Sequence, residues 1–137
     1  MTSLPPLRDL LDEYELLEGE DRYRLLIDLG RQLDPMPDAL KTDSTKVRGC
    51  SASVWVYPTT EGGRLHFLAD SNAAITKGIV ALILSAVQDK PAEEVARMDV
   101  TAALAPFELG KHLSANRTQG VPNMITLIKE TAQRLAA

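Results

Sequence analysis

The sequence is short of cysteine, of basic clusters and of long apolar runs, and each shortage excludes a class of protein. Its one cysteine, Cys50, cannot form an internal disulfide, a Cys-x-x-Cys redox pair or a set of thiolate ligands for zinc or an iron-sulfur cluster. The net charge of -4, without a long Lys/Arg block, argues against a nucleic-acid partner. The most apolar run, residues 78–87, is about half the ~20 residues of a membrane span, so we expect no membrane partner either.

Length and composition are those of an ordinary globular protein. The chain has 137 residues, of which 45% are hydrophobic and 25% charged, and this balance predicts one compact domain over residues 1–137. The N-terminus carries Asp9 and Asp12 where a secretory signal would have a basic start and an apolar core. We therefore expect a cytoplasmic protein.

Hydrophobic periodicity predicts two amphipathic helices at the start of the chain. Apolar residues recur at the i, i+3, i+4, i+7 spacing over residues 7–14 and again over 23–33. Pro35 and Pro37 end the second helix, so residues 34–45 are expected to form a loop.

The middle of the chain predicts strands. Residues 53–57 and 65–68 are rich in β-branched and aromatic side chains, and residues 60–63 supply the turn of an antiparallel hairpin. Residues 45–47 are a candidate for a short third strand.

The remaining segments predict further helices. We expect a buried helix over 73–87, a short helix over 90–98, irregular or short helical structure over 106–113, and a C-terminal helix over 121–135. This order predicts an α+β fold in which helices pack on one face of a small antiparallel three-stranded sheet.

Cys50 is the only residue that can carry thiol chemistry. A free cysteine is most often a small buried hydrophobe. This cysteine, however, follows Gly49, which permits a tight turn, and lies close to Lys46 and Arg48, whose positive charge favours the thiolate. A reactive loop thiol is therefore the competing interpretation.

Other chemistries have weaker support in the residues. A Cys-His hydrolase would take its base from His66 or His112, the only two histidines. A thiol peroxidase commonly needs a second, resolving cysteine, which the chain lacks. The histidines and carboxylates show no spacing typical of metal ligands, so we expect no metal.

Three further features have an ordinary structural interpretation. Trp55 is interpreted as a core residue, Asp70-Ser71-Asn72 as the N-cap of the following helix, and Arg117 as a solvent-exposed cation. Each is also a candidate for contact with a partner.

Three segments together resemble the successive signatures of the SufE-like family. They are VRGCSASVW (47–55), ADSNAAITKG (69–78) and HLSANRTQG (112–120). The family often has Asp-Ser-Asp where this chain has Asp70-Ser71-Asn72, and a proline or serine before the arginine where this chain has Ala115-Asn116. The resemblance runs over essentially the whole chain and implies helices over a small antiparallel sheet.

The resemblance also implies a function. Cys50 would accept persulfide sulfur from a pyridoxal-phosphate-dependent cysteine desulfurase, stimulate that enzyme, and deliver the sulfur to an iron-sulfur scaffold complex or another acceptor. The chain itself would hold no cofactor and would not be an independent enzyme. The family match makes five residues candidates for partner contact or loop positioning: Arg48, Gly49, Asp70, Asn72 and Arg117.

Two questions stay open at this point. A binding module that activates a desulfurase allosterically, without carrying sulfur, is the alternative function. The sequence is equally compatible with a monomer and a homodimer.

Overall fold

The order of helices and strands follows the predicted α+β pattern. The structure is a computed structural model that describes residues 4–48, 53–109 and 120–136. Its elements are α1 (Leu7–Leu16), α2 (Glu20–Gly30), η1 (Asp38–Leu40), β1 (Val54–Glu61), β2 (Arg64–Ser71), α3 (Ala74–Val87), β3 (Lys90–Pro91), α4 (Ala92–Arg97), α5 (Val100–Leu104), η2 (Ala105–Phe107) and α7 (Gly120–Ala136).

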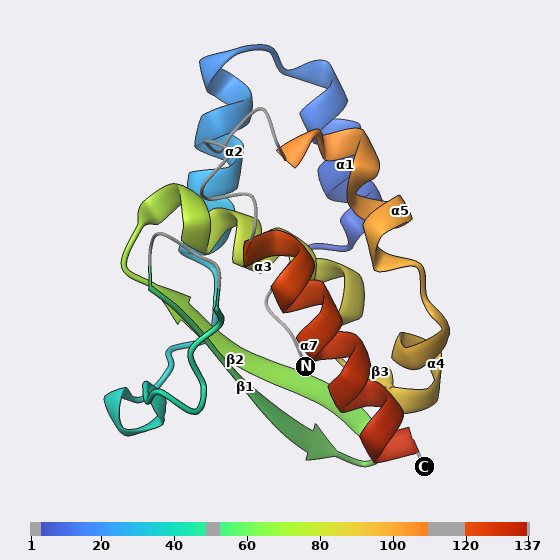
Figure 1. Cartoon of the computed structure of the whole chain (residues 1–137). Helices are drawn as coiled ribbons and strands as arrows, with labels where there is room; N and C mark the ends of the chain where they lie inside the picture. Colours follow the sequence, from blue (N-terminus) through green and yellow to red (C-terminus); the bar gives the residue numbers. More distant parts are fainter. Residues whose placement is uncertain (1–3, 49–52, 110–119, 137) are drawn as a thin grey trace.

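The sheet is antiparallel, with the strand order β1-β2-β3. β1 and β2 form a hairpin whose register runs from Val54 opposite Ser71 to Glu61 opposite Arg64. In Figure 1 the hairpin lies along the bottom of the view and the helices lie above it. The predicted helical layer on one face of a three-stranded antiparallel sheet is therefore confirmed.

Alternation along both strands explains why one face of the sheet is buried. Val54 and Val56 of β1, and Leu65, Phe67 and Ala69 of β2, are all buried in the core. Successive side chains of a strand point to opposite faces, so the residues between them form a second row on the other face. That row is half-buried or exposed.

Helix α3 is the buried centre of the fold, as its apolar sequence predicts. Apolar side chains cover nearly all sides of it, and Ala81, Leu82 and Leu84 have no exposed surface. Because a helix that is hydrophobic all round must be covered on all sides, α3 packs against the sheet through β2 and against α1, α2 and α5 elsewhere.

Helices α2 and α3 cross at two glycines. A Cβ atom built on Gly78 would lie 2.0 Å from the Leu26 carbonyl oxygen, and one built on Gly30 would lie 2.8 Å from the Gly78 nitrogen. Real Cβ atoms do not approach so closely. Only glycine at both positions lets the two backbones come into direct contact.

Gln88 satisfies the open edge of β2 beyond the short strand β3. Its side-chain amide donates to the Phe67 carbonyl oxygen at 2.9 Å, and its amide oxygen accepts from the Phe67 N–H at 2.7 Å. Both residues are buried. Unpaired backbone groups would be costly in this position, and the glutamine replaces the missing strand.

The N-terminal helices are joined to the rest of the chain by an aromatic contact. The Tyr14 hydroxyl donates to the Phe107 carbonyl oxygen at 2.7 Å, and the two rings lie 5.2 Å apart between centroids. The Arg22 guanidinium lies 4.4 Å from the centroid of the Tyr14 ring. A buried tyrosine hydroxyl requires such a partner.

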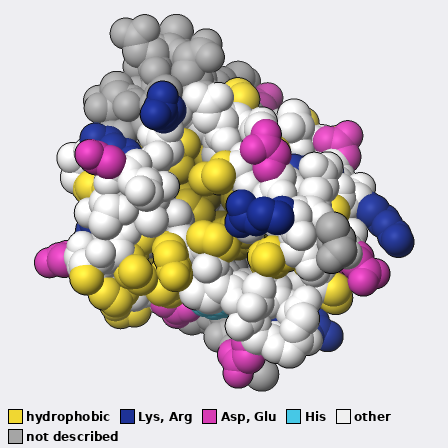
Figure 2. Space-filling model, turned by 60° about the horizontal axis from the view of Figure 1, so that its bottom comes forward, with side chains coloured by type: hydrophobic (Ala, Val, Ile, Leu, Met, Phe, Trp, Pro, Cys, Tyr) yellow, Lys and Arg dark blue, Asp and Glu magenta, His cyan; other side chains and the backbone are white. Residues whose placement is uncertain are grey.

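The face at the bottom of Figure 1 is mixed in character. Figure 2 brings this face forward and shows hydrophobic side chains in its middle, with basic and acidic side chains among and around them. Large hydrophobic side chains that stay partly exposed in the structure include Tyr57 of β1 and Leu127 of α7.

Three details of the sheet differ from the sequence prediction. The third strand is β3, Lys90–Pro91, which the sequence suggested as the start of a helix. Residues 45–47 instead run beside β1 with a single isolated bridge, between Lys46 and Trp55. Trp55 itself is half-buried and lies outside the core cluster, because it belongs to the second row of β1.

Replacing Gly78 with alanine should destabilise the fold. Alanine favours an exposed helix over glycine by about 1 kcal/mol, but here its methyl group would collide with the α2 backbone. We expect Gly78→Ala to lower the free energy of unfolding by about 1–3 kcal/mol in urea denaturation, because helix α2 must move away. Ser85→Ala on the same helix is the control and should change the free energy of unfolding little. An unchanged or raised stability of Gly78→Ala would contradict the close contact.

Candidate functional site

The chain reverses direction between residues that flank the only cysteine. The Val47 N–H donates to the Val54 carbonyl oxygen at 2.8 Å, and the Val56 N–H donates to the Thr45 carbonyl oxygen at 2.9 Å. Residues 45–47 therefore run antiparallel to residues 54–56. Gly49 and Cys50 fall between these two segments in the sequence and lie outside the described residues.

Asn72 binds the chain at Ser53, on the C-terminal side of Cys50. Its side-chain oxygen accepts from the Ser53 N–H at 3.1 Å, and its own N–H donates to the Ser53 carbonyl oxygen at 3.3 Å. Asn72 directly follows β2, so these two bonds extend the β1–β2 pairing by one step beyond Val54 and Ser71. Ser53 is thereby tied to the start of α3.

Asn123 binds the chain at Arg48, on the N-terminal side of Cys50. Its side-chain amide donates to the Arg48 carbonyl oxygen at 2.8 Å. Asn123 lies in the first turns of α7, 75 positions further along the chain than Arg48. Sequence reasoning missed this residue, because no local pattern marks a contact over such a separation.

Arg48 and Lys46 supply exposed positive charge beside Cys50 in the sequence. Both side chains are exposed, and no ion pair is formed by either among the described residues. Positive charge near a thiol favours the thiolate, which is the nucleophilic form of cysteine.

Residues 45–48 and 53–56, which are bonded on both sides of Cys50 in the sequence, are called the frame, and Asp70, opposite Trp55 in the hairpin, forms a charged cluster. Its carboxylate contacts the Lys41 ammonium at 2.7 Å and the Lys77 ammonium at 3.2 Å, and it accepts from the Ser71 N–H at 2.8 Å. The Lys41 ammonium also lies 5.7 Å from the centroid of the Trp55 ring. The cluster therefore joins the loop after α2 to both strands of the hairpin.

Burial alone would raise the pKa of Asp70. The hydrogen bonds from Lys41, the Ser71 N–H and Lys77, together with the charge of Lys77, outweigh that effect and leave the pKa below its ordinary value of 3.8. The hydrogen bonds with Asp70 and Asp38 raise the pKa of Lys41. The pair thus stays ionised over the neutral range.

The expected N-cap role of Asp70-Ser71-Asn72 is wrong for all three residues. The N-cap of α3 is Ala73, without a side-chain cap bond, and only Ser71 reaches the helix start, accepting from the Ala73 N–H at 3.3 Å. Asp70 and Asn72 point to Lys41, Lys77 and Ser53 instead. Longer-range partners replaced the local hydrogen bonds.

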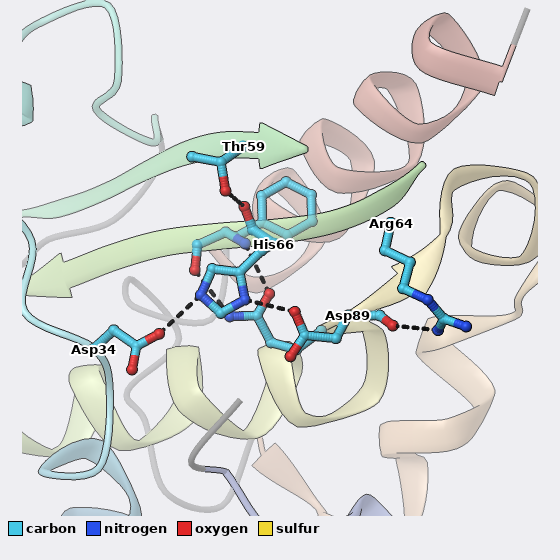
Figure 3. Close-up of polar contacts among 7 residues, drawn as sticks. Asp34, Thr59, Arg64, His66 and Asp89 are labelled. Carbon is cyan, nitrogen blue, oxygen red and sulfur yellow. Dashed lines mark hydrogen bonds and ion pairs between the residues drawn. The ribbon is translucent and has the colours of Figure 1, made fainter. Parts of the chain in front are cut away.

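His66 is held between two carboxylates, as Figure 3 shows. Its Nε2 atom lies 2.8 Å from an Asp34 carboxylate oxygen, and its Nδ1 atom lies 2.8 Å from an Asp89 carboxylate oxygen. Asp34 and Asp89 come from the loop after α2 and the turn after α3. Because both ring nitrogens are engaged, neither is free to act as a base in this arrangement.

His66 is also distant from the frame around Cys50. It pairs with Thr59, six residues along β1 from Ser53, which corresponds to about 20 Å at ~3.3 Å per residue. A pocket of about 390 Å³ lies beside His66. It is lined by Asp34, Thr59, Thr60, Glu61, His66 and Asp89. The structure therefore gives no support to a hydrolase with His66 as the base.

Four of the predicted residues, Gly49, Cys50, His112 and Arg117, lie outside the described residues. Within the part of the chain that is described, no group of three His, Cys, Asp or Glu residues could hold a metal ion. None of the helices in that part has the length and apolar character that a membrane crossing requires.

The chain matches a known protein family over most of its length. Residues 8–132 match the family model described as "SufE: Fe-S metabolism associated domain". Because this match covers far more than half of the chain, the protein belongs to the SufE family. The resemblance stated from three sequence segments is confirmed.

Individual relatives agree with this assignment. An uncharacterized SufE-like protein of Rhizobium meliloti is 37% identical over 138 residues, which cover 97% of this chain and 96% of the relative. The sulfur acceptor protein CsdE of Escherichia coli is 40% identical over 107 residues, which cover 77% of this chain and 73% of CsdE.

A solved structure has the same fold. The solution structure of a hypothetical protein from Thermus thermophilus aligns with a TM-score of 0.77 at 18% identity. The alignment covers 97% of this chain and 98% of that chain, so the architecture agrees from end to end.

The Ser53 N–H donates to the Asn72 side-chain oxygen, and an aspartate at this position also offers an acceptor. We expect Asn72→Asp to keep the free energy of unfolding, whereas Asn72→Ala loses about 1 kcal/mol, the net contribution of one hydrogen bond. Urea denaturation of both variants beside the wild type measures the difference. Equal stability of Asn72→Ala and the wild type would show that the side-chain bond contributes nothing.

Asp70 should make the free energy of unfolding depend on pH in the acidic range. A carboxylate whose pKa is lowered in the folded state stabilises the protein above its unfolded pKa, and this contribution is lost as the pH falls through the folded value. We therefore expect wild-type stability to fall more steeply than that of Asp70→Asn as the pH drops below 3.8. The measurement is urea denaturation at a series of pH values. Asp43→Asn, at an exposed position in the loop that carries Lys41, should keep the wild-type slope.

Proposed function

We propose that this SufE-family protein is a sulfur acceptor and that Cys50 is the accepting thiol. The observation that carries the proposal is the position of the only cysteine: it lies within the matched family region, between two residues that are hydrogen-bonded to separate elements. Such anchoring on rigid elements is what a reactive group needs to meet a second protein in a defined geometry.

The proposed reaction is thiol exchange with a persulfide. The Cys50 thiol loses its proton to solvent, and the thiolate attacks the outer sulfur of a persulfide on a cysteine desulfurase. A sulfur-sulfur bond forms to Cys50 while the bond to the desulfurase cysteine breaks, and the electron pair leaves with that cysteine as a thiolate. The product on this chain is the Cys50 persulfide.

The second half of the cycle repeats the same chemistry. A thiolate of an iron-sulfur scaffold complex, or of another acceptor, attacks the outer sulfur of Cys50 and releases Cys50 as a thiolate. The chain needs no cofactor of its own, because the pyridoxal phosphate belongs to the desulfurase. The protein would accelerate that enzyme by removing its persulfide, and it would act as a single cytoplasmic domain over residues 1–137.

Several candidate residues receive roles in this proposal. Arg48 would add positive charge beside the thiol, and Gly49 would let the backbone turn directly before it. Asp70 and Asn72 would hold the surrounding frame through their contacts with Lys41 and Ser53. Arg117, through its match to the family motif, would contact the desulfurase or position the segment that carries it.

The alternative is a module that activates the desulfurase allosterically and carries no sulfur. It predicts that the thiol is dispensable. Replacement of Cys50 therefore distinguishes the two functions.

Cys50→Ser should fold like the wild type and should neither gain sulfur nor accelerate a desulfurase. The test is incubation with a cysteine desulfurase, cysteine and a mild reductant, followed by intact mass of this chain and the rate of alanine formation. Wild type should gain the mass of one sulfur atom, and the gain should be absent from Cys50→Ser. Thr60→Ala, at the exposed far end of the hairpin, is the control.

Two results would contradict the proposal in different ways. Wild-type stimulation by Cys50→Ser would favour the allosteric module. Absence of added sulfur on wild type, with a desulfurase that is itself charged with persulfide, would refute the acceptor role.

A further inference from the structure

We propose that the pocket between the α1–α2 turn and the end of η2 binds a small organic monocarboxylate through the guanidinium of Arg22. The pocket has a volume of about 670 Å³, and its lining includes Tyr14, Glu20, Arg22, Tyr23, Arg24 and Glu108. The turn between α1 and α2 lies at the top of Figure 1, whereas the hairpin lies along the bottom. The inference involves neither Cys50 nor sulfur chemistry, so it adds a binding site to the proposed function.

The Arg22 side chain is held in a fixed position. Its Nε–H donates to the carbonyl oxygens of Tyr14, at 3.0 Å, and Leu17, at 2.7 Å, at the C-terminal end of α1. The guanidinium also lies 4.4 Å from the centroid of the Tyr14 ring. Tyr14 is itself fixed, because it is buried and its hydroxyl donates to the Phe107 carbonyl oxygen. A cation that is already immobilised loses less conformational freedom when a ligand binds.

Most of the donors of this guanidinium are unused. A guanidinium has five N–H donors in one plane, and the bonds to Tyr14 and Leu17 use only the donor on Nε. Among the described residues, neither Nη atom of Arg22 donates a hydrogen bond or forms an ion pair. Two parallel N–H donors match the two oxygens of a carboxylate. Arg22 therefore offers the pocket a preformed carboxylate-binding group.

The charges around Arg22 limit the kind of anion that fits. The lining contains two arginines, Arg22 and Arg24, and two glutamates, Glu20 and Glu108. Because like charges repel, the glutamates disfavour a ligand with several negative charges, such as a nucleotide or a diphosphate. A monocarboxylate carries one negative charge and needs only one guanidinium.

The size and the aromatic lining of the pocket predict an apolar or aromatic body for the ligand. Small-molecule sites have volumes of roughly 300–1,000 Å³, and this pocket lies within that range. Tyr14 and Tyr23 both line it, and 41% of the Tyr23 surface is exposed. Aromatic rings stack favourably on one another and also cover apolar groups.

Three probes separate the carboxylate from the rest of such a ligand. Benzoate carries a carboxylate on an aromatic ring, benzamide has nearly the same shape without the charge, and inorganic phosphate has the charge without the ring. Binding is followed by the amide chemical shifts of the full-length 15N-labelled protein at constant pH and ionic strength. We expect benzoate to shift the signals of residues that line the pocket, with half-saturation at about millimolar concentration. Benzamide and phosphate should need at least about tenfold higher concentrations, because each lacks one of the two contacts.

Substitution of Arg22 tests the guanidinium itself. Arg22→Gln cannot form the charged bidentate contact, so the preference for benzoate over benzamide should fall from about tenfold to about one. Arg22→Lys keeps the charge without the planar fork and should retain only part of the preference. Arg134→Gln, at an exposed position in the last turn of α7, is the control and should keep the wild-type preference. The ratio of the two probes is compared because loss of the bonds to α1 would weaken both probes alike.

Several results would overturn the inference. Equal half-saturating concentrations of benzoate and benzamide on the wild type would show that the carboxylate is not recognised. Tighter binding of phosphate than of benzoate would exclude a site for organic monocarboxylates. Shifts confined to residues outside the pocket, or a wild-type preference in Arg22→Gln, would remove Arg22 from the binding site.

The probe comparison does not depend on any variant or on the proposed sulfur transfer. The wild-type titrations decide the inference even if Arg22→Gln fails to fold, which urea denaturation would reveal. No desulfurase is present in the measurement. A wild type that accepts no sulfur would therefore refute the acceptor role and leave the carboxylate site to be decided by the benzoate titration alone.

Discussion

The contact between α2 and α3 at Gly30 and Gly78 is the constraint on which the rest of the structure depends. Helix α3 lies between α2 and the sheet, so its distance from α2 also sets where β2 lies. The loop that follows α2 then reaches the hairpin, where Asp34 meets His66 and Lys41 meets Asp70. The Asp70 cluster and the pairing of residues 45–47 with β1 both lie in the part of the chain between these two glycines.

The frame beside Cys50 uses two kinds of interaction with different sensitivities. On both sides of the cysteine in the sequence, Asn72 and Asn123 bind the backbone of Ser53 and Arg48 through neutral amides, which do not titrate over the range in which proteins stay folded. In the neighbouring strand β2, Asp70 is bound by two lysines and changes its charge only in acid. Hydrogen bonds between neutral groups are also less affected by salt than ion pairs.

Sequence patterns predicted the elements whose cause is local. The amphipathic spacing of α1 and α2, the alternation of β1 and β2, and the apolar run of α3 each follow from burial of one face or of all faces. The two-residue strand β3 was missed, because two residues have no period. Trp55 was interpreted as a core residue because its side chain is large and apolar. The alternation of β1 instead places it on the less buried face of the sheet.

The candidate site was predicted through recognisable motifs and missed where contacts are long-range. Arg48, Asp70 and Asn72 were singled out by the family signature, and all three contribute to the frame or lie within it. The capping interpretation failed because Asp70 and Asn72 found partners 29 and 19 positions away, Lys41 and Ser53. Asn123 has no sequence signal at all, since its role exists only after α7 has packed.

The tight turn at the other end of the hairpin gives the protein an attachment point far from Ser53, the bonded residue on the C-terminal side of the cysteine. Gly62 and Gly63 both have positive φ values, and no atom lies within 4 Å of the place where their side chains would begin. The strand length separates this turn from Ser53 by about 26 Å at ~3.3 Å per residue. A fluorescent reporter or a surface tether inserted in the turn would leave the single cysteine as the only sulfur nucleophile, so that delivery of sulfur to successive partners could be followed on one immobilised molecule.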